Sequence, residues 1–345
     1  MDYKIIADNA AKTEQSGRPT PESLAAARRL GVLSLVSPVS YGGRGADPAT
    51  LARELAAVAR HCPSTAWVAG TTAAAKLMAR SLPPGEARAE FFADPDAICC
   101  GSGSPGGTLT HGPGGSVVSG RWPSISGCED AEWAALAVAD GDGVSVVSLP
   151  TSALTVEHTW DVAGMRGTGS HTLVADAVPV PEHRIGNFAP LVPEQQRSFV
   201  LCVTAPVVGA ARGALDVVTA MFASGHRPHL TPYQRMSESP AARQWYAEAT
   251  RLVGRAERTM LGVAEAELPA ENAGQWLTAE LADAAQDCRD ALELMLDVHG
   301  SSSFAAANPL QRYWRDVAVG SRHRVLSPIL AIEFYGQALT AGERP

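Results

Sequence analysis

A histidine near the end of the chain, His323 in the run RDVAVGSRH, offers acid–base chemistry. An imidazole titrates near neutral pH, so it can hold a proton or take one from a phenol or an amine. The same residue could instead be a helix histidine bonded to a carboxylate. Its residue type alone does not decide between these two interpretations.

Two further runs carry hydroxyl groups next to glycines. Ser126 precedes Gly127 in GRWPSISGC, and residues 164–170 read GMRGTGS. Closely spaced glycines let the backbone approach a planar ligand, and Thr168 and Ser170 could donate hydrogen bonds to its carbonyl groups. Trp122 could supply a flat apolar wall. The structural alternatives are a turn serine and a plain glycine-rich turn.

Several other chemistries are excluded or disfavoured. Residues 101–106, GSGSPG, match GxGxxG, but turn and strand residues follow where a dinucleotide fingerprint needs a helix. We therefore predict no nicotinamide-binding site. The six cysteines are scattered without a CxxC pair, so neither a zinc site nor a disulfide framework is indicated, and free buried thiols in a reducing cytosol are expected.

Composition limits the partners. The 345 residues carry a formal net charge of −8, which lacks the basic field that nucleic-acid binding needs. No run of about 18 apolar residues predicts a membrane span. The first 20 residues bear charges where a signal peptide would be apolar, so we expect a cytoplasmic protein.

Three segments must position these residues. Residues 1–95 show helical spacing of apolar side chains, as in DPATLARELAAVARHC. Residues 96–190 carry short β-type runs such as GVSVVSL between glycine-rich breaks, which predicts an antiparallel barrel or sandwich. Residues 191–345 return to helices long enough to predict an up-and-down bundle.

Three separated stretches resemble the acyl-CoA dehydrogenase superfamily. They are the YGGRG turn with the helix after it, TWDVAGMRGTGSHTLVADAVPVPEHR, and NPLQRYWRDVAVGSRH, and they follow the family's order over nearly the whole chain. The resemblance implies an α+β fold with an N-terminal helical domain (1–95), a middle antiparallel β-barrel or sandwich (96–190) and a C-terminal four-helix bundle (191–345). It also implies a homodimer or homotetramer.

Within this superfamily, GRWPSISGC and RDVAVGSRH are most similar to the group D two-component flavin-dependent monooxygenases, or hydroxylases. Such enzymes bind reduced FAD or FMN from a separate NAD(P)H-flavin reductase, form a flavin hydroperoxide with O2, and oxygenate a small molecule. The resemblance implies a hydroxylase or N-oxygenase for an aromatic or amine metabolite, in specialised metabolism such as antibiotic biosynthesis.

The resemblance also assigns site residues, and no metal is among them. The implied catalytic residues are His323 and Ser126. Arg315 and Asp316 could equally form a structural ion pair. The implied substrate contacts are Trp67, Ser102 and Phe199, and the implied flavin contacts are Trp122, Ser124, Ser126, Met165, Arg166, Gly167, Thr168, Gly169, Ser170, Gly300, Gln311, Arg312 and Arg315.

A dehydrogenase would need a carboxylate base. The two positions where the superfamily places its catalytic glutamate align with Arg324 and Phe199, and neither side chain is a base at neutral pH. An acyl-CoA or carrier-bound acyl dehydrogenase with a displaced base, Glu194 or Glu333, stays open as an alternative. So does a flavin-free binding or non-redox protein on the same fold.

Overall fold

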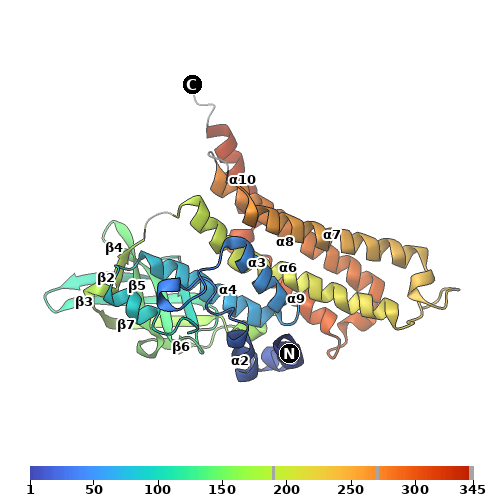
Figure 1. The fold of residues 1–345 in the computed structure, drawn as a ribbon, viewed down its shortest axis with the longest axis horizontal. Coiled ribbons are helices and arrows are strands. Elements are labelled where there is room, and N and C mark those ends of the chain that lie inside the picture. Colours follow the sequence, from blue (N-terminus) through green and yellow to red (C-terminus); the bar gives the residue numbers. More distant parts are fainter. Residues whose placement is uncertain (189–190, 269–271, 342–345) are drawn as a thin grey trace.

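The computed structural model describes residues 1–188, 191–268 and 272–341, and the chain runs from helices through a sheet and back to helices (Figure 1). Proline at the first position and a capping side chain start several helices: Thr20 accepts from the Ser23 amide, and Asp47 from the Thr50 amide. The N-terminal helices are α1 (Asp2–Ser16), α2 (Pro21–Arg29), α3 (Pro48–Ala59), α4 (Pro63–Met78) and α5 (Glu86–Phe91).

One eight-stranded sheet follows, in the order β6-β7-β3-β2-β4-β5-β8, with β1 beside β4. The expectation of an antiparallel sheet was wrong in part, because β1 and β2 both run parallel to β4. These two strands lie end to end along β4, and the β2–β3 hairpin turns the chain back before β4 begins. The strands are β1 (Cys99–Ser102), β2 (Gly107–Gly112), β3 (Gly115–Ile125), β4 (Trp133–Asp140), β5 (Gly143–Pro150), β6 (Thr155–Glu157), β7 (His171–Val180) and β8 (Ile185–Asn187).

The C-terminal part is helical, as expected. Helices α6, α7 and α8 pack against one another, and α9 lies against α6 and α8. Figure 1 shows the long helices extending away from the sheet, with α10 projecting from the body. Their bounds are α6 (Pro193–Ala223), α7 (Pro240–Glu265), α8 (Ala273–His299), α9 (Pro309–Gly320) and α10 (Pro328–Thr340).

Helix α6 forms the centre of the molecule. It is long and apolar enough to cross a membrane, but 83% of its apolar window is buried inside the chain, as in a core helix. Small residues allow neighbouring helices to approach it. A Cβ on Gly70 of α4 would lie 2.1 Å from the Cys202 carbonyl oxygen of α6, and one on Gly209 would lie 2.2 Å from the Ala56 oxygen of α3. Helix α4 in turn contacts β1, so it joins α6 to the sheet.

Buried polar groups complete the core. The Lys76 ammonium on α4 is fully buried and donates to the carbonyl oxygens of Leu33 (2.8 Å) and Pro95 (2.5 Å), which ties two loops to this helix. All six cysteines are free and buried. Burial raises the pKa of every one of these thiols, to about 11 for Cys128 and about 12 for Cys99 and Cys202.

Candidate active site

A cleft of about 1460 Å³ opens between the sheet and the helical part of the chain. Its walls come from α4, from the segment between β1 and β2, from the end of β3, and from α6, α8 and α10. No aspartate or glutamate lines it among the described residues. Ten residues predicted from the sequence meet there: Trp67, Ser102, Trp122, Ser124, Ser126, Met165, Thr168, Ser170, Phe199 and His323.

A row of hydrogen bonds crosses one wall of the cleft. The Trp67 indole Nε1 donates to Ser126 Oγ at 3.1 Å, and Ser126 Oγ lies 2.7 Å from Ser170 Oγ. Ser170 Oγ is 2.7 Å from Thr168 Oγ1, which donates to the Met165 carbonyl at 2.8 Å. These side chains come from α4, from the turn after β3 and from the turn before β7, so the row joins three separate elements.

The direction of this row follows from its two ends. An indole N–H can only donate and a carbonyl oxygen can only accept, while each hydroxyl has one proton. Thr168 donates its one hydroxyl proton to the Met165 carbonyl. Ser170 must then donate to Thr168, and Ser126 must donate to Ser170. The Ser126 oxygen also accepts from Trp67, which leaves it one lone pair and no free proton.

The turn that carries Met165 is clamped onto α9. Met165 has left-handed backbone dihedrals, with φ 54°, and its amide donates to Asp316 Oδ1 at 2.5 Å. A Cβ on Gly164 would lie 2.0 Å from the Arg315 carbonyl oxygen, so only glycine fits at this approach. Burial raises the pKa of Asp316 to about 7. Trp160, which sequence reasoning did not single out, also lines the cleft and donates to the Met165 carbonyl at 2.9 Å.

His323 lies just after α9 and lines the cleft next to Trp67. Its ring meets the Trp67 ring edge-on, with centroids 5.7 Å apart. Burial, with a smaller contribution from the Arg324 charge, lowers the pKa of His323 to about 4. The imidazole is therefore neutral near pH 7. Its Nδ1 is buried and has no hydrogen-bond partner within the described residues, and such an atom suits a ligand.

Trp122 differs from its predicted role. Its indole has no exposed surface, it donates to the Ala137 carbonyl at 2.9 Å, and Gly106, Gly107 and Gly120 lie directly against it. A side chain covered in this way supports the cleft wall and does not present a flat face to a ligand. Ser124, two residues on, is exposed with φ 61°, where the pairing of β3 with β7 is irregular.

Comparisons with known proteins agree with this geometry. Residues 3–81 match the family model "Acyl-CoA dehydrogenase, N-terminal domain", and residues 201–328 match "Acyl-CoA dehydrogenase, C-terminal domain". The chain is 30% identical over 371 residues to the "FADH(2)-dependent resorcinol hydroxylase, oxygenase component" of Rhizobium sp. (strain MTP-10005), covering 92% of this chain and 87% of that protein. The chain belongs to the two-component flavin-dependent monooxygenases of the acyl-CoA dehydrogenase superfamily.

Further relatives support the same assignment. The "Pigment production hydroxylase" of Rhodococcus sp. (strain ATCC 21145) is 31% identical over 367 residues, covering 96% of this chain and 92% of that protein. The solved structure of XiaF from Streptomyces sp. in complex with FADH2 and glycerol matches with a TM-score of 0.91 and 28% identity, over 99% of this chain and 93% of that one. The predicted family and class of enzyme are thus confirmed.

The cleft of this monooxygenase suits a flavin. It has the volume for a tricyclic ring and one hydroxyl oxygen with a spare lone pair. Over residues 1–188, 191–268 and 272–341 it also has a lining without carboxylates and one buried imidazole nitrogen without a partner. Ser126 is the residue that would face such a ring's polar edge, and Ser170 and Thr168 would hold its hydroxyl from behind. This fit concerns the isoalloxazine part alone.

The remaining predicted flavin contacts do not line the cleft. Arg166 is exposed and donates to the Val162 carbonyl. Arg315 pairs with Glu14 at 2.5 Å and donates to Gln311 and to the Ala163 carbonyl, so the suggested Arg315–Asp316 ion pair is wrong. Further such residues are Gly167 and Gly169, packed against the N-terminal segment, Gly300, which ends α8, and Arg312.

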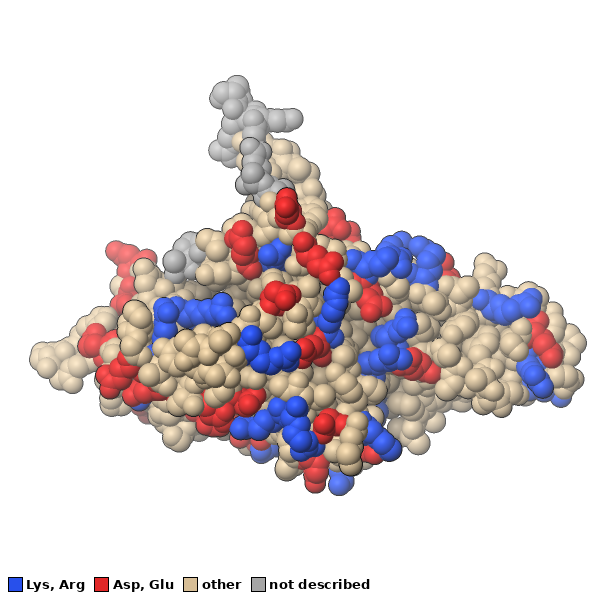
Figure 2. All heavy atoms as spheres, viewed as in Figure 1, with Lys and Arg blue, Asp and Glu red and all other residues tan. Residues whose placement is uncertain are grey.

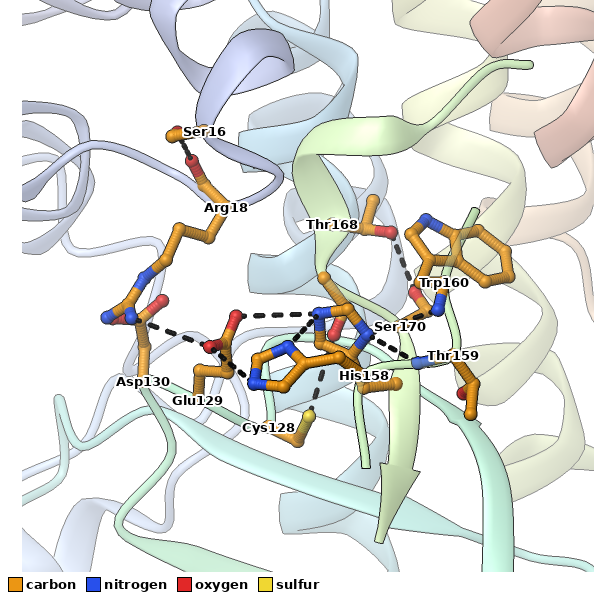
Figure 3. Close-up of polar contacts among 12 residues, drawn as sticks. Ser16, Arg18, Cys128, Glu129, Asp130, His158, Thr159, Trp160, Thr168 and Ser170 are labelled. Atoms are coloured by element: carbon orange, nitrogen blue, oxygen red, sulfur yellow. Dashed lines mark hydrogen bonds and ion pairs between the residues drawn. The ribbon is translucent and has the colours of Figure 1, made fainter. Parts of the chain in front are cut away.

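A cluster of Glu129, His158 and His171 behind the cleft does not fit a metal ion, although its ligand atoms lie close together (Figure 3). His171 Nδ1 accepts the backbone amides of Thr159 (3.2 Å) and Trp160 (3.1 Å). The proton of the neutral ring must then sit on Nε2, the atom that faces Glu129. A metal-binding histidine instead donates from its other nitrogen. The cluster therefore supports the turn that leads to Trp160.

Proposed function

We propose that this cleft binds reduced flavin, FADH2 or FMNH2, delivered by a separate NAD(P)H-flavin reductase, and that the enzyme oxygenates a small aromatic or amine metabolite. When bound, the reduced flavin supplies the activation of O2 and the transfer of one oxygen atom. The observation that carries the proposal is the meeting of Ser126, Trp67 and His323 in one cleft, which no carboxylate lines in the part of the chain that the structure describes. The resorcinol hydroxylase among the relatives favours a phenolic substrate.

The side chains around the cleft would have different roles in substrate binding and reaction. His323, neutral near pH 7, would accept a hydrogen bond from the O–H of a phenol or the N–H of an amine at its free Nδ1, which makes the substrate more electron-rich. Trp67 and Phe199 would hold the apolar body of the substrate, and Ser102 would offer a polar contact. These apolar walls would keep water away from the reacting atoms.

The lining also argues against the dehydrogenase alternative. Glu194 and Glu333, the two candidates for a displaced base, are exposed and neither lines the cleft. Abstraction of an α-proton needs a base within about 3 Å of that proton. Arg324, which lines the cleft and bonds to Ser104, cannot serve as this base.

The decisive experiment feeds the enzyme with reduced flavin from a reductase under 18O2 and measures products from a panel of phenols, indoles and amines. We expect one 18O atom per product and a rate loss of roughly a hundredfold or more for His323→Ala, the range of general acid–base contributions. His229→Ala is the matched control, since His229 is exposed and lies outside the cleft. Unchanged product formation by His323→Ala would exclude the proposed role.

We also propose the finer architecture. The division into domains 1–95, 96–190 and 191–345 follows the helix–strand–helix order, and α6 to α9 would form the four-helix bundle of the last domain. The enzyme would assemble as a homodimer or homotetramer. Gly300, Gln311, Arg312 and Arg315 would then contact the nucleotide tail of a flavin across a subunit boundary, away from the cleft of their own chain.

A further inference from the structure

We infer that Thr168 and Ser170 make the site select reduced over oxidised flavin, by holding the Ser126 hydroxyl as a pure hydrogen-bond acceptor toward the cleft. The inference rests on the proposed flavin site. It assigns a positioning role to two residues that act through Ser126. The observations that carry it are the four hydrogen bonds between Trp67 and the Met165 carbonyl.

The acceptor character of Ser126 is imposed from both sides. Its oxygen accepts the Trp67 indole N–H at 3.1 Å, and its only proton points to Ser170 at 2.7 Å. The one remaining lone pair belongs to the side chain of Ser126, a residue that lines the cleft. A ligand atom that meets this oxygen must therefore bring a hydrogen of its own.

The two oxidation states of flavin differ in whether a nitrogen of the central ring carries a hydrogen. The central ring of reduced flavin carries an N–H, whereas the corresponding nitrogen of the oxidised ring is a bare acceptor. Placed opposite Ser126, a reduced ring would complete a hydrogen bond, whereas an oxidised ring would set one acceptor against another. Leaving a buried polar group without its partner costs enough to change an equilibrium roughly tenfold or more.

Thr168 is the residue that sets the direction. It is fully buried, and its proton is anchored on the Met165 carbonyl. Without the Thr168 hydroxyl, Ser170 would lose its acceptor and could donate to Ser126 instead. The Ser126 proton would then turn toward the cleft, where it suits the bare nitrogen of the oxidised ring.

The test measures dissociation constants for oxidised and for anaerobically reduced flavin, with FAD and FMN each in both states, by equilibrium dialysis. The readout is the ratio of the oxidised to the reduced constant. The variants are Thr168→Val, which keeps the side-chain shape, Thr168→Ser, which restores the hydroxyl, Ser170→Ala and Ser126→Ala. Thermal unfolding of each variant verifies folding.

We expect the wild type and Thr168→Ser to share a large ratio. Ser126→Ala should lower it, and Thr168→Val and Ser170→Ala should lower it further, by roughly tenfold or more against the wild type. Equal weakening of both oxidation states in Thr168→Val would show a merely structural role and overturn the inference. A wild type that binds both forms equally would do the same, while a wild type that binds neither form would overturn the proposed flavin site itself.

Discussion

His323 shows how much burial changes one residue. The histidine lies against Trp67 in the cleft wall, and desolvation lowers its pKa to about 4, far from the value of about 6.5 in an unfolded chain. Between these two values the unfolded state binds more protons than the folded state. Stability contributed by the neutral ring is therefore complete above pH 6.5 and is lost as the pH falls toward 4.

This difference predicts a pH dependence that belongs to His323 alone. Wild type should lose up to about 3 kcal/mol of unfolding free energy between pH 6.5 and pH 4 that His323→Asn keeps, at about 1.4 kcal/mol per unit of pKa shift. Urea unfolding of both proteins at intervals across this range measures it. Parallel curves for the two proteins would contradict the assigned burial.

At the scale of elements, Asp316 joins α9 to the turn that carries Met165. Its carboxyl accepts the Met165 amide at 2.5 Å, and burial raises its pKa to about 7. Between pH 4 and pH 7 the folded state binds more protons than the unfolded state. The change of stability with pH therefore has the opposite sign to that of His323. The stability is fully present below about pH 4 and is lost as the pH rises through 7.

Asp316→Asn tests this clamp, because the amide keeps the shape and an acceptor oxygen but cannot ionise. We expect the difference in melting temperature between wild type and variant to shift in the variant's favour as the pH rises from 4 to 8. Wild type would carry a buried charge at the upper end, and the variant would not. A difference that stays constant with pH would show that the carboxyl titrates as it does in solvent.

The order of helices and strands could be predicted from the sequence, but some contacts between them could not. Apolar spacing in the long C-terminal helices and short β-type runs separated by glycines predict helix, sheet and helix. The parallel pairing of β1 with β4 was missed because alternation with a period of two is the same in parallel and antiparallel strands. Lys76, among alanines on α4, has the sequence of a solvated residue but lies fully buried between two loop carbonyls.

Some residues of the candidate site could likewise be predicted from the sequence, and others could not. Ser126 and Ser170 were singled out from two runs, 44 residues apart, and the structure brings their oxygens to 2.7 Å. The partner of Arg315 could not be predicted, because Glu14 lies near the other end of the chain and charged helix residues carry no signal of their partner in the sequence. The covered indole of Trp122 depends on glycines of neighbouring strand segments, whose register the sequence does not specify.

At the scale of the whole molecule, α10 presents an exposed apolar surface. This helix projects from the body, and its sequence PILAIEFYGQALT has one charged residue (Figure 1). Figure 2 shows acidic and basic side chains mixed over the body, with few on the projecting helix. Ile329 and Ile332 are 80% and 70% exposed, which is unusual for isoleucine and is typical of an interaction surface.

The assembly prediction follows from that surface. Ile329→Ser with Ile332→Ser should shift the enzyme toward smaller species in light scattering coupled to size-exclusion chromatography, because about 25 cal/mol is lost per Å² of apolar surface no longer buried. Gln337→Ala on the same helix is the control, since it changes a polar side chain that donates to Glu333 one turn away. Unchanged mass in the double variant would remove α10 from the interface.

The protection of the six thiols has a consequence for a catalyst that handles O2. Oxygen chemistry on flavin can release hydrogen peroxide, and peroxide attacks the thiolate form of cysteine. Here every cysteine is buried with its pKa raised, so almost none is ionised at neutral pH. A leaking turnover would therefore find almost no cysteine thiolate to oxidise, and the thiols should stay reduced through uncoupled cycles.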